Sequence, residues 1–216
     1  MRNILPTEFV KVLTTTEFPN LWASQILSLM TLNLINFILI LRIFEATGSS
    51  IAVSLVWLFY AMPAIILGPF SGTIIDLASR RKLLIATNIA QAITVLFYLP
   101  AKEALWPIYT VIFAYSALNQ IYVPAEAATL PSLVSEKLLP AANTIFVFTL
   151  YAMFLLGVGA AGPLIEAVGR NTPFVFMSLL LFLAAWAVWQ LPKDRKSETV
   201  RNPGELWERF VEGFQF

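Results

Sequence analysis

The sequence contains neither cysteine nor histidine, and charged residues make up only 12% of its 216 residues. The lack of cysteine excludes disulfide bonds and thiolate chemistry. The lack of histidine removes the commonest general base and the commonest metal ligand. The net charge of +1 implies no strongly charged partner such as a nucleic acid. We therefore expect no metal, no cofactor and no nucleic-acid surface.

The low charge has a counterpart in long apolar runs. A soluble domain is about a quarter charged, whereas this chain is 58% hydrophobic with a mean hydropathy of +0.76. A membrane-spanning helix needs roughly 20 mostly apolar residues, and runs near this length recur along the chain. Six such runs occupy residues 20–41, 51–75, 83–99, 106–125, 142–165 and 173–191. The predicted fold class is an all-α membrane protein with six transmembrane helices.

Basic residues in the connections predict the orientation, because Lys and Arg are concentrated on the cytoplasmic side of membranes. The side that holds the N-terminus carries eleven basic residues and the other side three, Arg42, Lys102 and Arg170. The chain is therefore expected in the inner or plasma membrane of the cell, with both termini in the cytoplasm. The predicted divisions are a cytoplasmic N-terminus at 1–19, the transmembrane domain at 20–192 and a cytoplasmic linker with an amphipathic helix at 193–216.

The connection between the second and third runs holds the most specific local motif, Gly72 to Lys82, which reads GTIIDLASRRK. It resembles the cytoplasmic loop motif of the major facilitator superfamily at Gly72, Asp76, Arg80 and Arg81. Leu77 and Ser79 depart from that motif. The resemblance implies that these four residues form a gating element. Gly72 would then let its helix approach a neighbour closely.

Two further stretches are similar to the drug and siderophore exporters of that superfamily, among them enterobactin exporters and macrolide efflux proteins. Tyr122 to Asn143 contains their Pro-Ala, Leu-Pro, Leu-Val and Ala-Asn pairs, and Asn143 is predicted to cap the fifth helix. Gly157, Gly159, Gly162 and Pro163 resemble the antiporter motif of that helix. An ordinary packing face of small residues is an equally good interpretation of these glycines.

The resemblance implies the first half of a twelve-helix fold, built as a 3+3 inverted repeat, with 193–216 leading into a seventh helix. A second six-helix half would then be needed, either in the same longer chain or in another subunit. We expect that the 216 residues do not transport alone, and we favour a truncated chain over a true half-size transporter or a homodimer.

Polar residues on the first and fourth helices are the candidate substrate site, since the resembled family lines its central cavity with both helices. The candidates recur at helical spacing and are Asn33, Asn36, Tyr115, Asn119 and Tyr122. Amides and aromatic rings suit an amphiphilic organic molecule. Interhelical packing by the same amides is an equally good interpretation, and it is favoured for Asn88 and Gln91.

Glu126 and Glu166 are the acidic residues within or beside the fourth and fifth helices, and either is a candidate proton carrier. The predicted function is proton-coupled efflux of a small organic molecule, such as a drug or siderophore, across the lipid bilayer by alternating access. The alternatives are an inactive fragment or half-size subunit, and a lipid or lysolipid transporter. A membrane enzyme is not expected, because no histidine and no second intramembrane aspartate are present.

Overall fold

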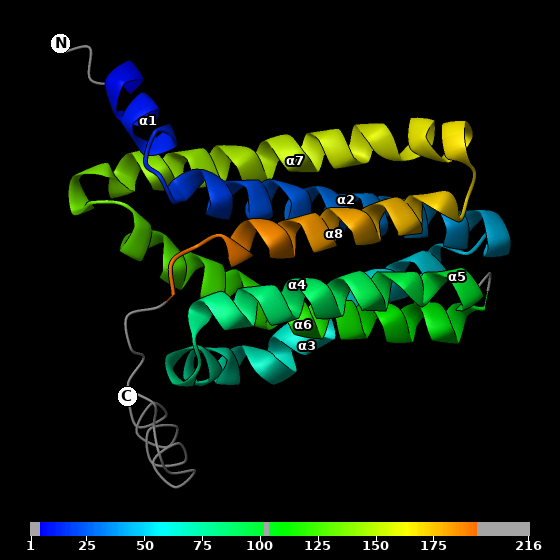
Figure 1. Cartoon of the computed structure of the whole chain (residues 1–216). Coiled ribbons are helices and arrows are strands. Elements are labelled where there is room, and N and C mark those ends of the chain that lie inside the picture. The colour runs from blue at the N-terminus through cyan, green and yellow to red at the C-terminus, as the bar shows by residue number, and fades with distance from the viewer. Residues whose placement is uncertain (1–4, 102–103, 194–216) are drawn as a thin grey trace, which may run out of the picture.

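The computed structural model describes residues 5–101 and 104–193, and these ranges are almost entirely helical (Figure 1). Short elements are α1 (Leu5–Leu13), α5 (Tyr98–Ala101) and the 3₁₀ turn η1 (Glu136–Leu138). The long helices of the described ranges are α2 (Phe18–Thr47), α3 (Ser50–Leu77), α4 (Arg80–Leu96), α6 (Leu105–Leu133), α7 (Leu139–Val168) and α8 (Thr172–Trp189). They correspond in order to the six predicted runs. The amphipathic helix predicted within 193–216 lies almost wholly outside the described residues.

Successive long helices run in opposite directions. One end of the bundle holds α1, the start of α2, the α3–α4 connection, η1 and the end of α8 (Figure 1). We call this the first end, and the opposite end, with the short α2–α3 and α7–α8 connections, the second end. The arrangement agrees with an even number of crossings. The assignment of the first end to the cytoplasm stays a prediction.

Five of the long helices have the length and composition of membrane spans, and α6 is the exception among the described residues. It is 29 residues long, but tyrosine, serine, asparagine and glutamine interrupt its apolar residues. In a membrane such residues are tolerated where they face the interior of the bundle. Tyr115, Ser116, Tyr122 and Glu126 of α6 are indeed buried. The low hydropathy of α6 therefore comes from its polar inner face.

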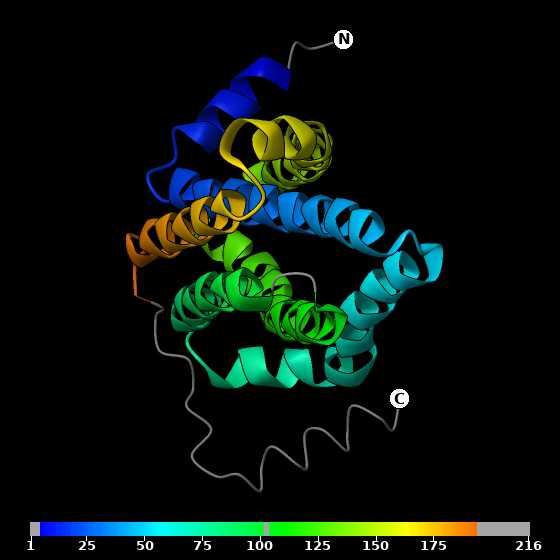
Figure 2. The same ribbon diagram turned by 90° about the vertical axis from the view of Figure 1, so that its right-hand side faces the viewer.

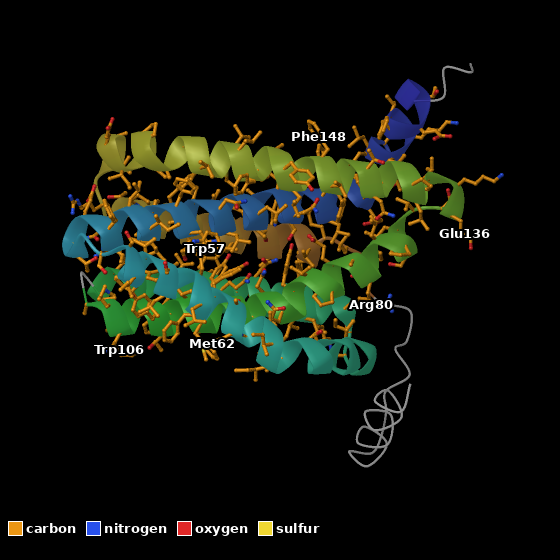
Figure 3. The ribbon with its side chains drawn as sticks, turned by 180° about the vertical axis from the view of Figure 1, so that it is seen from behind. Trp57, Met62, Arg80, Trp106, Glu136 and Phe148 are labelled. Carbon is orange, nitrogen blue, oxygen red and sulfur yellow. The ribbon has the colours of Figure 1, made fainter. Side chains whose placement is uncertain are left out.

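The outer faces of the bundle are apolar. Phe148 on α7 is 72% exposed and Trp106 on α6 is 74% exposed, and Figure 3 shows them on opposite outer sides. In water, so much uncovered aromatic surface would be unfavourable. The chain is therefore a multi-pass membrane protein.

The boundaries on both sides of the α6–α7 connection differ from the prediction. Helix α6 continues through Pro124 and Pro131 to Leu133, whereas the fourth run was expected to end near residue 125. Proline within a membrane helix is tolerated because hydroxyl groups and neighbouring helices satisfy the freed carbonyls. The predicted capping role of Asn143 is wrong, since α7 already begins at Leu139.

The third predicted span begins earlier than expected, because Ser79 caps α4. Its hydroxyl accepts a hydrogen bond from the Lys82 backbone amide at 3.3 Å. Arg80 and Arg81 thus lie in the first turn of a helix and not in a loop. The serine at the position where the family motif has glycine therefore has a structural role of its own.

Helix α7 packs closely against α2 at one glycine. A Cβ atom built on Gly157 would lie 2.5 Å from the Asn33 Cβ atom. Built Cβ atoms on Gly159 and Gly162 meet nothing within 4 Å. The glycine cluster of α7 is therefore not one packing face, and Gly157 alone forms the close contact with α2.

Helices α3 and α7 lie on opposite outer sides of the bundle, with α2, α8, α4 and α6 between them (Figures 1 and 2). In the apolar stretch of each helix that could cross a membrane, only 17% of the residues are buried in α3 and in α7. The share is 39% in α2 and α4 and 50% in α8. The buried apolar side chains form two clusters along the inner helices. One contains Leu34, Ile112 and Phe174, and the other contains Phe18 and Leu84.

Candidate functional site

A buried chain of hydrogen bonds joins α2, α4 and α6. Ser28 Oγ donates to Asn88 Oδ1 at 3.0 Å, and Asn88 Nδ2 donates to Ser24 Oγ at 3.2 Å. Ser24 Oγ lies 3.1 Å from the Tyr122 hydroxyl, which donates to Glu126 Oε1 at 2.9 Å. We call these five residues the buried polar chain. It connects an acidic side chain on α6 to two other helices.

All five members are withdrawn from the surface of the described chain. Ser24 and Asn88 are fully buried, and Glu126 is 8% exposed. Burial of an ionisable group without polar partners costs several kcal/mol, so a buried carboxyl group is retained where it is hydrogen-bonded. Within membrane proteins such groups mark ion and proton pathways more often than packing sites. Glu126 is therefore the leading candidate for a functional acid.

Helical spacing places the members of the buried polar chain. Ser24 and Ser28 are four residues apart on α2, and Tyr122 and Glu126 are four residues apart on α6. Residues at this spacing lie one above the other on the same face of a helix. Asn88 on α4 hydrogen-bonds to both serines, and Ser24 contacts Tyr122 directly. The Asn88 amide thus joins α4 to the face of α2 that meets α6.

The candidate cavity residues do not share one location. Asn33 faces α7 at Gly157, and its Nδ2 atom donates to the Leu29 carbonyl of its own helix at 2.8 Å. Ser24, which contacts Tyr122, is nine positions away on α2, which places it on the opposite face of a 3.6-residue helix. Asn33 and Tyr122 therefore contact different sides of α2. Their common cavity was a prediction that this geometry does not favour.

The other candidate residues have mixed surroundings. Tyr115 is 3% exposed and belongs to the apolar core beside Ile112, and Asn36 is buried on α2. Asn119 on α6 is half-buried. Tyr122 contacts another helix through the Ser24 hydroxyl of α2. The binding of a substrate by these five residues stays a prediction.

The two candidate proton carriers are clearly distinguished. Glu126 is buried and hydrogen-bonded, whereas Glu166 is exposed near the second end of α7. An exposed carboxylate is solvated and has no special reason to exchange a proton with the bundle interior. Glu126 is the better candidate.

The gating motif is only partly described. Asp76 is in the last turn of α3, but its side chain lies outside the described residues. Gly72 is exposed and a Cβ built on it meets nothing within 4 Å, so its predicted close packing against a neighbour is not found within the described chain. Arg80 Nη1 donates to the Ala128 carbonyl of α6 at 2.7 Å, and Arg81 Nη2 donates to the Trp189 carbonyl of α8. The two arginines therefore tie the start of α4 to two neighbouring helices.

Ser24, Ser28 and Asn88 were missed as site residues from the sequence. A serine in an apolar helix is common, and the sequence favours Asn88 as an amide that packs between helices. The available signal was the matched four-residue spacing of Ser24–Ser28 and Tyr122–Glu126. That signal acquires meaning only when α2 and α6 are known to meet at these two pairs.

Comparison with known proteins identifies the family. The model of the Major Facilitator Superfamily matches residues 21–215, nearly the whole chain. This chain belongs to the Major Facilitator Superfamily. The prediction made from residues 72–82, 122–143 and 157–163 is thereby confirmed.

Individual members of the superfamily show where the similarity lies. The chain is 28% identical over 182 residues to the uncharacterized MFS-type transporter YfiS of Bacillus subtilis, covering 83% of this chain and 43% of that protein. It is 32% identical over 127 residues to macrolide efflux protein A of Streptococcus pyogenes, covering 56% of this chain and 31% of that protein. The chain thus spans less than half the length of these curated relatives.

Proposed function

We propose that these 216 residues form the N-terminal six-helix half of an exporter that moves a small amphiphilic organic molecule across the cell membrane in exchange for protons. Membership of the superfamily supports transport as the activity. The similarity to a protein named for macrolide efflux supports export and a bulky organic substrate. The buried carboxyl group of Glu126 carries the proposal of proton exchange, because its partner Tyr122 connects it through Ser24 of α2 to Asn88 of α4.

The second half is proposed to dock on α3 and α7. These are the least buried long helices of the described chain, and both line the outside of the bundle (Figure 2). Gly72 on α3 and Gly159 and Gly162 on α7 have open space where a Cβ atom would project. Uncovered small residues allow helices to approach closely in a membrane. Such a partner would give Gly72 the close neighbour that the described chain lacks.

The test is transport in proteoliposomes with a pH gradient, with erythromycin and ethidium as probes. The 216-residue chain would be compared with the same chain joined at Phe216 to the C-terminal remainder of macrolide efflux protein A. We expect gradient-dependent movement of at least one probe in the joined protein and none above protein-free vesicles in the 216-residue chain. Movement by the short chain would contradict the need for a second half. A folded joined protein that moves neither probe would contradict macrolide-like efflux.

The first end of the bundle is proposed to face the cytoplasm. The absence of native cysteine makes single-cysteine labelling direct. In intact cells, a membrane-impermeant maleimide is expected to label Ser49→Cys at the α2–α3 connection and not Ser135→Cys beside η1. Both should be labelled after permeabilisation. The reverse pattern in intact cells would show that the first end faces the outside of the cell, contrary to the distribution of basic residues.

A further inference from the structure

The buried polar chain has a single donor direction while Glu126 is ionised. A carboxylate only accepts, so the Tyr122 hydroxyl must donate to Glu126 Oε1, which lies 2.9 Å away. A hydroxyl has one hydrogen, and the Tyr122 oxygen therefore accepts from Ser24 Oγ. Ser24 in turn accepts from Asn88 Nδ2, while Asn88 Oδ1 accepts from Ser28. Every donor hydrogen in the chain points toward the carboxylate.

A proton on Glu126 makes the opposite order possible, because the carboxyl group then has an O–H to donate. The carboxyl O–H then donates to the Tyr122 oxygen, and the Tyr122 hydroxyl turns its hydrogen toward Ser24. When Ser24 also turns its hydrogen toward Asn88, it meets the amide nitrogen Nδ2, which donates and cannot accept. Ser28 can turn its hydroxyl to the carbonyl one helical turn earlier, as serine commonly does in helices. No atom other than the added proton is gained or lost.

Asn88 is the member of the buried polar chain that cannot reverse by turning a hydroxyl hydrogen. Its donor and its acceptor are different heavy atoms, so reversal requires the amide to rotate and exchange the positions of Nδ2 and Oδ1. We propose that Asn88 is the positioning residue of a protonation sensor, with one amide orientation for ionised Glu126 and the opposite one for protonated Glu126. This rests on the proposed function in one respect, namely that Glu126 takes up a proton during transport.

The fully buried site makes the two orientations distinct. Water is not available to compensate a mismatched donor or acceptor where Asn88 and Ser24 are fully buried, and an unpaired amide there is costly. The Asn88 amide contacts both serines of α2, so its rotation changes the contact between α2 and α4. Proton binding on α6 is thereby communicated to two other helices. This is a local change that could bias a rigid-body movement of the helices.

The basic residues at the start of α4 either donate to carbonyl groups of neighbouring helices or are exposed. Arg80 donates to the Ala128 carbonyl and Arg81 to the Trp189 carbonyl, and Lys82 is exposed. On the remaining elements packed against α6, the described ionisable side chains are Glu17, Arg42 and Glu45 on or before α2, Tyr60 on α3, Tyr98 on α5, and Tyr151 and Glu166 on α7. Tyr122 is the hydrogen-bonded partner that connects the carboxyl group to α2 and α4.

The experiment is infrared difference spectroscopy between acidic and alkaline pH on the reconstituted 216-residue chain, with asparagine ¹³C-labelled at its side-chain carbonyl. Glu126→Gln assigns the carboxyl band, and Asn88→Leu and Asn88→Asp assign the Asn88 amide band. Gln91→Leu is the matched control, because Gln91 is a buried amide one turn away on α4 whose Oε1 and Nε2 atoms have no hydrogen-bond partner among the described residues.

We expect the labelled Asn88 band to shift over the same pH interval as the Glu126 carboxyl band, and to stop shifting in Glu126→Gln. Gln91→Leu should retain both changes. A carboxyl band that titrates while the Asn88 band stays constant would overturn the sensor and leave proton-coupled transport standing. A Glu126 band that never changes would also overturn it. The efflux proposal is tested separately, by measuring the transport of the two probes by the joined protein.

Discussion

Replacing Glu126 by glutamine is expected to abolish proton-driven export while leaving the helix bundle folded. Glutamine has nearly the shape of the acid and its amide oxygen can still accept from the Tyr122 hydroxyl, which now contacts Glu126 Oε1 at 2.9 Å. It cannot bind and release a proton. We expect gradient-driven efflux of the probe by the joined protein to fall at least about tenfold, toward the rate without a pH gradient.

Two controls make this result specific. Glu166→Gln changes an exposed acid at the second end and should leave efflux within about twofold of the original rate. Exchange of labelled for unlabelled probe at equal pH needs no net proton movement, and it should persist in Glu126→Gln. Equal loss of efflux in both variants, or full efflux in Glu126→Gln, would remove Glu126 from the coupling mechanism.

Replacing Gly157 by alanine is expected to destabilise the bundle, although alanine is the better helix former. The added Cβ atom would lie 2.5 Å from the Asn33 Cβ atom and 3.3 Å from the Asn33 backbone carbon and the Leu34 nitrogen. Neither contact is with a flexible chain end, so α2 and α7 must move apart. Overpacking of this kind costs about 1–3 kcal/mol. The change should appear as a lower thermal unfolding temperature in detergent.

The same substitution at Gly159 or Gly162 provides the matched controls. Both glycines lie on α7, and a Cβ atom on either meets nothing within 4 Å in the described chain. In a helix interior alanine is favoured over glycine by about 0.8–1 kcal/mol, so these variants should be unchanged or slightly more stable. Similar destabilisation at all three positions would show that the glycine cluster acts as one face. A stable Gly157→Ala variant would contradict the close contact between α2 and α7.

The order and approximate limits of the six long helices could be predicted from the sequence, because a helix that crosses lipid must satisfy its backbone internally and cover itself with apolar side chains. That demand leaves a strong pattern in the sequence. The boundaries near Pro124, Pro131 and Ser79 were less predictable. There, α6 continues through two prolines, and the Ser79 hydroxyl caps α4 within the loop motif.

The candidate site depended far more on tertiary structure. Spacing along one helix shows which residues share a face, but it does not show what that face meets. The spacing predicts that Asn33 and Asn36 share a cavity with Tyr122. In the structure Asn33 contacts Gly157 on α7, whereas Tyr122 contacts Ser24 on α2. Asn88 was expected to join helices through its amide, and it does so, but only the structure shows that its partners are the two serines of α2.

The sequence by itself determined that this chain is a helical membrane protein of the Major Facilitator Superfamily. Hydrophobic length and family motifs are properties of contiguous residues, and they survive without knowledge of the packing. Only the tertiary structure decided that Glu126 is buried and Glu166 is exposed, and that three helices share one hydrogen-bonded chain. Burial and pairing depend on which helices become neighbours, and that depends on side-chain packing between segments far apart in the sequence.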